Sequence, residues 1–483
     1  MTDIANEPDD QMSMVRLLVY SNQFDVEGLI ASTSTWMRAR VRPDVIRDVI
    51  DAYGEVYATL STHAEGYPTV DALRAVVTTG PEGFGMAAVA MTGETISSGA
   101  RQIVAAADRA DERPLWVLGW GGANTLAEAL AYVRRTRPAE AVDRFVSALR
   151  VYTISDQDDA GPWIRREFPL LHYIAMPSTP DAEQYAQATW TGISGDRFYL
   201  NGDGADFTTF TTAWVDANIR SKGPLGRLYI PPCCIHEGDT PSFLGLIDNG
   251  LASFMSPTYG GWGGRYVWRR YYGETRPHWT QGGDMYPGKD HSRDTVVGVD
   301  GRPHTSDQAT IWRWRDAFQR DFAARMDWTI MPVAGANHNP VAIVNGQGST
   351  APITIDAAVG TPIPLDASAS TDPDGDRLTY SWFFYPEAGT GIPTKPVVDD
   401  PSAATGAGGS LETGGAPSAG ADGPVRPPAR ATLDRATGSR VTATLRTPGV
   451  AHIILVVDDN GTPSLTTYRR IIVRSGPEPR RTP

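Results

Sequence analysis

The chain has little cysteine. Only Cys233 and Cys234 occur among its 483 residues, and they are adjacent. A disulfide between adjacent cysteines is strained, and a metal site of the Cys-x-x-Cys type cannot be built from this pair alone. The cysteines therefore leave the redox compartment undetermined.

Long apolar runs and excess positive charge are also missing. No stretch of about eighteen or more apolar residues occurs, which predicts that nothing spans a membrane. Lysine and arginine number 43 against 56 aspartates and glutamates, and the formal net charge is -13. This balance argues against a nucleic-acid-binding surface. The expected partner is a small molecule or an oligosaccharide, and the oligomeric state stays open.

Up to about residue 332, short apolar runs alternate with helical stretches. Examples are VEGLIAST and LWVLGW as strands and NTLAEALAYVRRTR as a helix. Such alternation predicts an α/β domain over residues 1–332, with a mostly parallel open sheet and helices on both faces. In such sheets, ligands bind at the carboxyl ends of the strands.

Residues 333–483 follow a period of two instead. Strand candidates such as RLTYSWFFY and AHIILVVDD are joined by turn sequences such as DPDGD. This pattern predicts a C-terminal all-β sandwich of the immunoglobulin or PKD type. A stretch rich in glycine, alanine, proline and serine, near 401–428, predicts a disordered surface loop within it.

The N-terminal run MTDIANEPDDQ crowds Asp3, Asp9 and Asp10 together. In one interpretation, Asp9 and Asp10 are N-cap residues of a helix that begins at Gln11. In the other, the three carboxylates converge on a hard cation, which can hold several ionised carboxylates close together and lower the pKa of a coordinated water. The residues alone do not decide between these two interpretations.

The same run resembles the aspartate cluster of the calcium-dependent nucleoside hydrolases. The longer run TDIANEPDDQMSMVRLLVYSNQFDVEGLIAST is closer to the nucleoside-hydrolase-like domain of bacterial cellulose-binding proteins. LWVLGWGGANTLAEAL and HEGDTPSFLGLIDNGL extend the resemblance over most of residues 1–332. DGDRLTYSWFFYPEAG and VVDDNGTPSLTTYRRIIV are similar to the β-sandwich that usually follows that domain.

Carried to the matching positions, the resemblance implies a calcium site. Its ligands would be Asp3, Asp10, Asp239 and the main-chain carbonyl of Asn124, with Asp3 also the catalytic base that deprotonates the metal-bound water. Asp9 would bind sugar hydroxyls. The implied activity is a calcium-dependent glycosidase that hydrolyses N- or O-glycosidic bonds of furanosides or plant-derived oligosaccharides, with inversion. The alternative is a non-catalytic carbohydrate-binding protein, specifically cellulose-binding, on the same scaffold.

Two further residues are candidate substrate contacts. Where nucleoside hydrolases have a histidine directly before the last calcium aspartate, this chain has Glu237 and Gly238, with His236 displaced by two. Glu237 is either a general acid toward an alcohol leaving group or a structural carboxylate. Trp262, in YGGWGGRY, is either a stacking platform for a sugar ring or a core residue.

The position of Asp3 raises an expectation about the gene. A carboxylate at the end of a first strand needs about five or six residues before it, and Asp3 has two. Either the fold lacks a central strand, at a large cost in buried apolar surface, or the start codon was assigned too late. We expect a start codon further upstream, with room for that strand. No signal peptide is visible in the given sequence, and the localisation stays open. An upstream stretch with a signal peptide would fit a secreted, polysaccharide-directed protein.

Overall fold

The computed structural model describes residues 1–91, 95–109, 111–176, 188–194, 199, 201–233, 235–270, 274–281, 292–390 and 430–475. The stretch near 401–428, for which the sequence predicts disorder, lies outside these residues, as does Cys234. None of the described helices is long and apolar enough to cross a membrane.

The N-terminal part alternates strands and helices, as predicted. Its strands are β1 (Leu29–Ala31), β2 (Val77–Thr79), β3 (Leu115–Gly119), β4 (Leu149–Thr153), β5 (His172–Ala175), β6 (Val267–Arg269), β7 (His278–Thr280), β8 (Asp294–Val297) and β9 (Pro303–Ser306). Its helices are α1 (Pro8–Val19), α2 (Pro43–Leu60), α3 (Val70–Ala75), α4 (Gly85–Met91), α5 (Ser98–Ala107), α6 (Asn124–Thr136), α7 (Ala139–Ala148), α8 (Ala160–Glu167), α9 (Thr212–Val215), α10 (Gly223–Arg227), α11 (Pro241–Leu244), α12 (Ala309–Trp312) and α13 (Arg315–Trp328).

Apolar spacing decides which face each of these helices buries. In α2, Ile46, Val49, Ile50 and Tyr53 recur at helical intervals and all are buried. Pro43 occupies the first helical position, where a missing N–H costs nothing. The helix therefore starts at a fixed residue and presents one stripe to the core.

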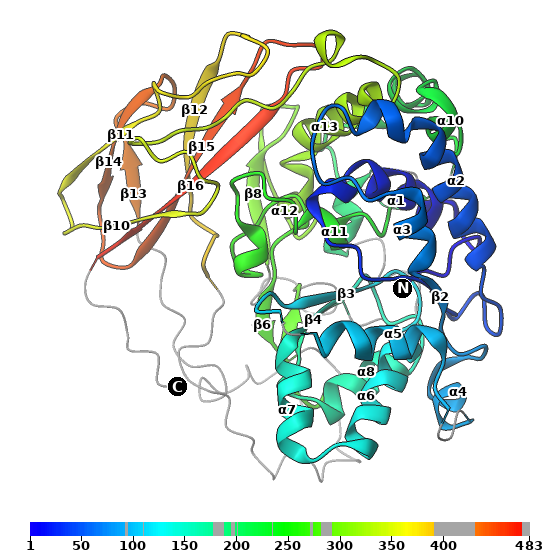
Figure 1. Ribbon diagram of the computed structural model, residues 1–483. Coiled ribbons are helices and arrows are strands. Elements are labelled where there is room, and N and C mark those ends of the chain that lie inside the picture. The colour runs from blue at the N-terminus through cyan, green and yellow to red at the C-terminus, as the bar shows by residue number, and fades with distance from the viewer. Residues whose placement is uncertain are drawn as a thin grey trace.

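The central sheet has the order β3-β4-β5-β7-β6. Its strands are parallel except for the edge pair β6 and β7, and β1 with β2 forms a separate parallel pair. In Figure 1, α5, α6, α7 and α8 lie on one side of β3 and β4, while α1, α2 and α13 lie on the other. The predicted α/β fold, with a mostly parallel sheet and helices on both faces, is confirmed.

Residues 1 and 2 join the β1–β2 pair to the central sheet. Thr2 donates its N–H to the Ile30 carbonyl at 2.9 Å and accepts from the Ser32 N–H at 2.8 Å. Met1 donates to the Leu118 carbonyl at 2.9 Å and accepts from the Trp120 N–H at 2.9 Å. These four bonds hold the backbone just before Asp3 between β1 and β3.

The C-terminal part consists of two β-sheets. Its strands are β10 (Ile353–Asp356), β11 (Pro362–Asp366), β12 (Thr379–Tyr385), β13 (Ala431–Leu433), β14 (Arg440–Leu445), β15 (Val450–Asp458) and β16 (Thr466–Arg474). One sheet has the order β10-β16-β15-β12 and the other β11-β14-β13. Alternating residues such as Leu365, Trp382, Val441 and Leu455 fill the space between the sheets. The predicted all-β sandwich is confirmed.

The two parts share one apolar core. Tyr385 and Tyr468 of the sandwich belong to the same buried cluster as Trp262 and Trp314 of the α/β part. The buried guanidinium of Arg470 donates to three main-chain carbonyls between residues 251 and 260. Figure 1 shows β12, β15 and β16 side by side with α12, α13 and β8. The α/β part and the β-sandwich that follows α13 therefore pack against each other through one continuous apolar core.

Candidate functional site

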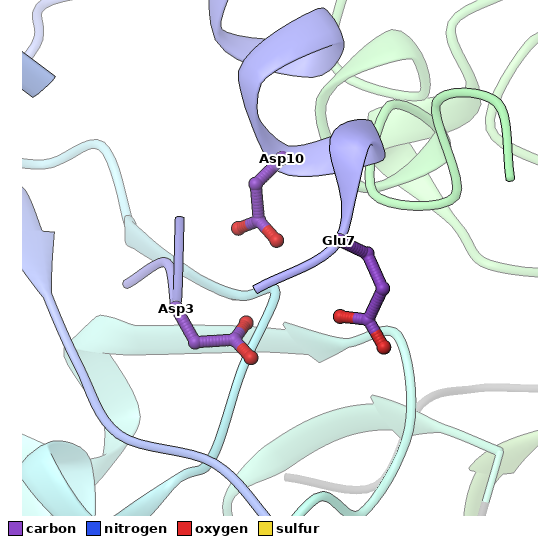
Figure 2. Close-up of side chains that lie close together, drawn as sticks. All are labelled: Asp3, Glu7 and Asp10. Atoms are coloured by element: carbon purple, nitrogen blue, oxygen red, sulfur yellow. The ribbon is translucent and has the colours of Figure 1, made fainter. Parts of the chain in front are cut away.

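Three segments bring carboxylates together at one end of the sheet. Asp3 directly follows the residues held between β1 and β3, and Glu7, Asp9 and Asp10 lie at the start of α1. Asp239 lies in the turn that leads into α11. Figure 2 shows the carboxylates of Asp3, Glu7 and Asp10 around a common space. The site thus joins the chain start to a segment more than 200 residues away.

The helix start differs from the N-cap interpretation. Helix α1 begins at Pro8 rather than Gln11, and its N-cap is Glu7, whose side chain makes no capping hydrogen bond. Asp9 and Asp10 therefore lie inside the first turn. There they benefit from the positive end of the helix dipole, but they do not cap it.

Two overlapping sets of carboxylates have the spacing of metal ligands. The first set consists of Asp3, Glu7 and Asp10, and the second consists of Asp9, Asp10 and Asp239. Within each set, one carboxylate oxygen from every residue lies within 4.8 Å of those from the other two. Asp3 and Asp10 are each 2% exposed, Asp239 is 3% exposed and Asp9 is 9% exposed. Asp10 belongs to both sets and is the centre of the cluster.

Burial and mutual repulsion act on these groups in the same direction. Desolvation is the main cause that raises the pKa of Asp3, Asp10 and Asp239, and the neighbouring carboxylates raise the pKa of Asp10 and Asp239 further. The pKa of Glu7 rises to about 8, through desolvation first and then through Asp9 and Asp3. The ionised cluster is therefore unfavourable until a positive charge compensates it.

Protein groups compensate the charge of the cluster only in part. The Met1 ammonium favours ionised Asp3, but desolvation lowers the pKa of that ammonium to about 6. Within the described residues, Asp3, Asp10 and Asp239 form no ion pair with arginine, lysine or histidine. Thr2 donates a hydroxyl hydrogen bond to Asp10. Ser34 lies close enough to favour ionised Asp3, but neither oxygen of Asp3 has a hydrogen bond of good geometry, and Oδ2 of Asp239 has none. An all-oxygen set of this charge fits a hard cation such as calcium and not zinc.

Two glycines let the surrounding chain approach these carboxylates. A Cβ at Gly121 would lie 2.7 Å from Oδ1 of Asp3, and a Cβ at Gly238 would lie 2.7 Å from Oδ2 of Asp9. Both distances are too short for a real contact. The glycine turn after β3 and the turn before Asp239 therefore shape the site, a role that sequence reasoning did not assign to either glycine.

Asn124 is the first residue of α6 and is fully buried. Its side-chain amide donates to the Thr33 hydroxyl at 3.0 Å and to the Gly83 carbonyl at 2.8 Å, and its N–H donates to Asp158 at 3.1 Å. These bonds fix the WGGANT turn beside the cluster. The role of the Asn124 carbonyl as a ligand stays a prediction.

Glu237 is buried beneath the carboxylate cluster. This position differs from the substrate contact that the sequence predicts. It is 0% exposed and forms an ion pair with Arg16 of α1 at 2.8 Å. Tyr229 donates its hydroxyl to the same carboxylate at 2.7 Å. Of the two interpretations of Glu237, the structure fits the structural carboxylate.

Trp262 also differs from the expected substrate contact. It is 1% exposed, and its ring packs edge-to-face against Phe318 and Tyr468. It is therefore a core residue at the boundary with the sandwich, out of reach of a sugar.

The fold and the acidic site define an α/β protein of the nucleoside-hydrolase-like class, joined to a β-sandwich. Residues 1–266 match the family model described as "Cellulose-binding Sde182, nucleoside hydrolase-like domain", and residues 362–475 match "Cellulose-binding protein Sde0182, C-terminal domain". The chain belongs to this family of cellulose-binding Sde182 proteins.

A solved structure supports the same assignment. The chain is similar to a nucleoside hydrolase-related hypothetical protein from Saccharophagus degradans that is associated with carbohydrate metabolism. The two are 30% identical, the match covers 98% of each chain, and the TM-score is 0.75. No protein with a curated description matches the chain.

Proposed function

We propose that this protein binds cellulose or a related plant oligosaccharide through a calcium ion held by Asp3, Asp10 and Asp239. The observation that carries the proposal is the buried carboxylate cluster. It consists of two sets that share Asp10, and within each set one oxygen from every member lies within 4.8 Å of the others. The family's description as cellulose-binding and the relative associated with carbohydrate metabolism favour a sugar ligand.

The different burial of the four aspartates suggests which of them would bind the cation and which would bind the sugar. Asp3, Asp10 and Asp239 are nearly inaccessible and suit a cation, whereas Asp9, at 9% exposed, is the most open of the four aspartates. Vicinal sugar hydroxyls are oxygen ligands that a calcium ion accepts alongside carboxylates. Asp9 would accept hydrogen bonds from those hydroxyls, and half-buried Glu7 would complete the negative charge of the site.

A second candidate is hydrolysis of a glycosidic bond at the same place. The observation that favours it is the raised pKa of Asp3, because a base with a pKa nearer neutrality takes up a proton more readily. A bound calcium ion would lower the pKa of its water. Asp3 would accept the proton of that water, and attack on the anomeric carbon would invert its configuration.

One experiment tests both candidates. Retention on insoluble cellulose and release of reducing sugar from nucleosides, aryl furanosides and cell-wall oligosaccharides are measured with calcium and with a chelator. The variant is Asp10→Asn, and its matched control is Asp71→Asn, a carboxylate whose side chain is 97% exposed.

The outcomes separate the candidates. Calcium-dependent retention that is lost in Asp10→Asn, without sugar release, agrees with a binding protein. Calcium-dependent sugar release makes it a glycosidase. Retention that is equal with chelator and equal in Asp10→Asn would contradict the proposed site.

A further inference from the structure

A slot of about 510 Å³ lies between the facing edges of β1 and β3. Residues 28–30 line one edge and residues 115–118 the other. The remaining two walls are helical, with Leu17 of α1 on one side and Ile103 of α5 on the other. The slot thus has two strand edges and two helix faces as its boundaries. A strand in the middle of a sheet that helices cover on both faces has the same neighbours.

The backbone hydrogen bonds of residues 1 and 2 set the direction and the register that a strand in this slot would have. Met1 bonds to β3 through Leu118 and Trp120, and Thr2 bonds to β1 through Ile30 and Ser32. The backbone groups of a strand alternate between its two neighbours. The same pattern continued backwards places the next residue against Gly28 and Ile30, and the residue before it against Trp116 and Leu118.

Apolar side chains of two cores line the slot on its two faces, and charged side chains such as Asp25, Arg109 and Arg113 also line it. Leu29 and Phe243 belong to the core that α1 covers, whereas Ile30 and Ile103 belong to the core that α5 covers. A strand buried on both faces is apolar at successive positions rather than at alternate ones.

We propose that this slot is the acceptor for an extended apolar β-strand that runs parallel to β1 and β3 and continues directly into Met1. The inference rests on the two strand edges, the helices that face them and the register set by residues 1 and 2, and it does not depend on the proposed function. Residues 115–118 span about 13 Å at the usual rise of a strand, so about four to five residues fill the slot.

The test extends the full chain before Met1 by five residues. One variant carries alternating valine and isoleucine, and its matched control carries alternating glycine and serine. We expect only the apolar extension to raise the midpoint of thermal unfolding, by about 5 °C or more. Its amide exchange at Ile30 and Leu118 should slow at least tenfold, because both N–H groups would gain a partner. Ala106→Trp, whose indole would enter the slot, should remove the gain.

Two results would overturn the proposal. The first is an apolar extension that changes neither the unfolding midpoint nor exchange at Ile30 and Leu118 beyond the glycine–serine control. The second comes from the N-terminal peptide of the protein isolated from its own cells. Apolar residues joined to the Met1 amine agree with the proposal, whereas a Met1 amine joined to no preceding residue contradicts it.

Discussion

Gly121 lies directly against Asp3. A Cβ at position 121 would stand 2.7 Å from Oδ1 and 2.9 Å from Cβ of Asp3. The residue after Trp120 must therefore lack a side chain, or the carboxylate must move. The close contact makes the turn after β3 one wall of the carboxylate cluster.

Gly121→Ala should weaken calcium binding at least tenfold, because the added methyl group displaces Asp3 from the other ligands. Titration calorimetry measures the affinity. Gly335→Ala is the matched control, since the nearest atom to its Cβ would lie 3.7 Å away. An unchanged affinity in Gly121→Ala would show that Asp3 is not a ligand.

Asp10→Asn should have opposite effects with and without calcium. Without calcium, removing the carboxylate shared by both sets relieves repulsion and raises the unfolding midpoint. With calcium, the wild type should gain about 3 °C or more from millimolar calcium, and the variant should gain nothing. Differential scanning fluorimetry in chelator and in calcium measures both effects. The prediction fails if the variant is less stable than the wild type in chelator.

The stability of the calcium-free protein should fall as the pH rises. The pKa of Glu7 is raised from 4.5 to about 8, so the folded state holds its proton over that range while the unfolded state has released it. The stabilisation from protonated Glu7 is complete below about pH 4.5 and is lost as the pH rises through 8. Unfolding midpoints between pH 5 and 8.5 measure the slope. Calcium should flatten the slope, and Glu7→Gln should reduce it without removing it, because the raised pKa values of Asp3, Asp10 and Asp239 contribute in the same direction. A midpoint that rises with pH in chelator would refute the assignment.

The buried ion pair between Arg16 and Glu237 should stabilise the positions of Asp10 and Asp239. It links α1, which carries Asp10, to the turn that carries Asp239. Arg16→Met leaves a buried carboxylate without its partner, which costs about 3–5 kcal/mol. Arg16→Met combined with Glu237→Gln should recover most of that loss. Urea unfolding measures all three proteins, and a single variant as stable as the wild type would contradict this role.

Trp262→Ala should destabilise the protein without weakening ligand binding. Removing a buried tryptophan costs about 3–5 kcal/mol, and the ring lies against Phe318 and Tyr468 rather than at the carboxylates. Urea unfolding and cellulose retention of the folded variant measure the two effects separately. A tenfold loss of retention in a folded variant would restore the sugar contact that the sequence predicts.

The sequence predicted the architecture well because the apolar period changes only once. It also marked Asp3, Asp9, Asp10 and Asp239, although only the family resemblance linked Asp239 to the others. The contact between them depends on how residues 1 and 2 are held between two strands, and no local pattern encodes that long-range pairing.

Glu7 was the residue of the cluster that sequence reasoning missed. A signal for it existed, because Pro8 is favoured at the first position of a helix and places Glu7 at the N-cap. The family resemblance drew attention to Glu237, because it lies close to the last implied calcium aspartate, and neighbouring glycines suggested an exposed loop for Trp262. Their burial comes from α1 and from the sandwich, partners that local sequence does not reveal.

The shared core has a consequence for how this protein can evolve. At Gly250, a Cβ would lie 1.9 Å from the main-chain oxygen of Tyr468, so the two architectures meet backbone to backbone. A gene rearrangement that exchanged the sandwich for another domain would have to recreate that fit and cover Trp262 and Trp314 again. We therefore expect the two parts to be inherited together, and the similar chain from Saccharophagus degradans is matched over 98% of its length.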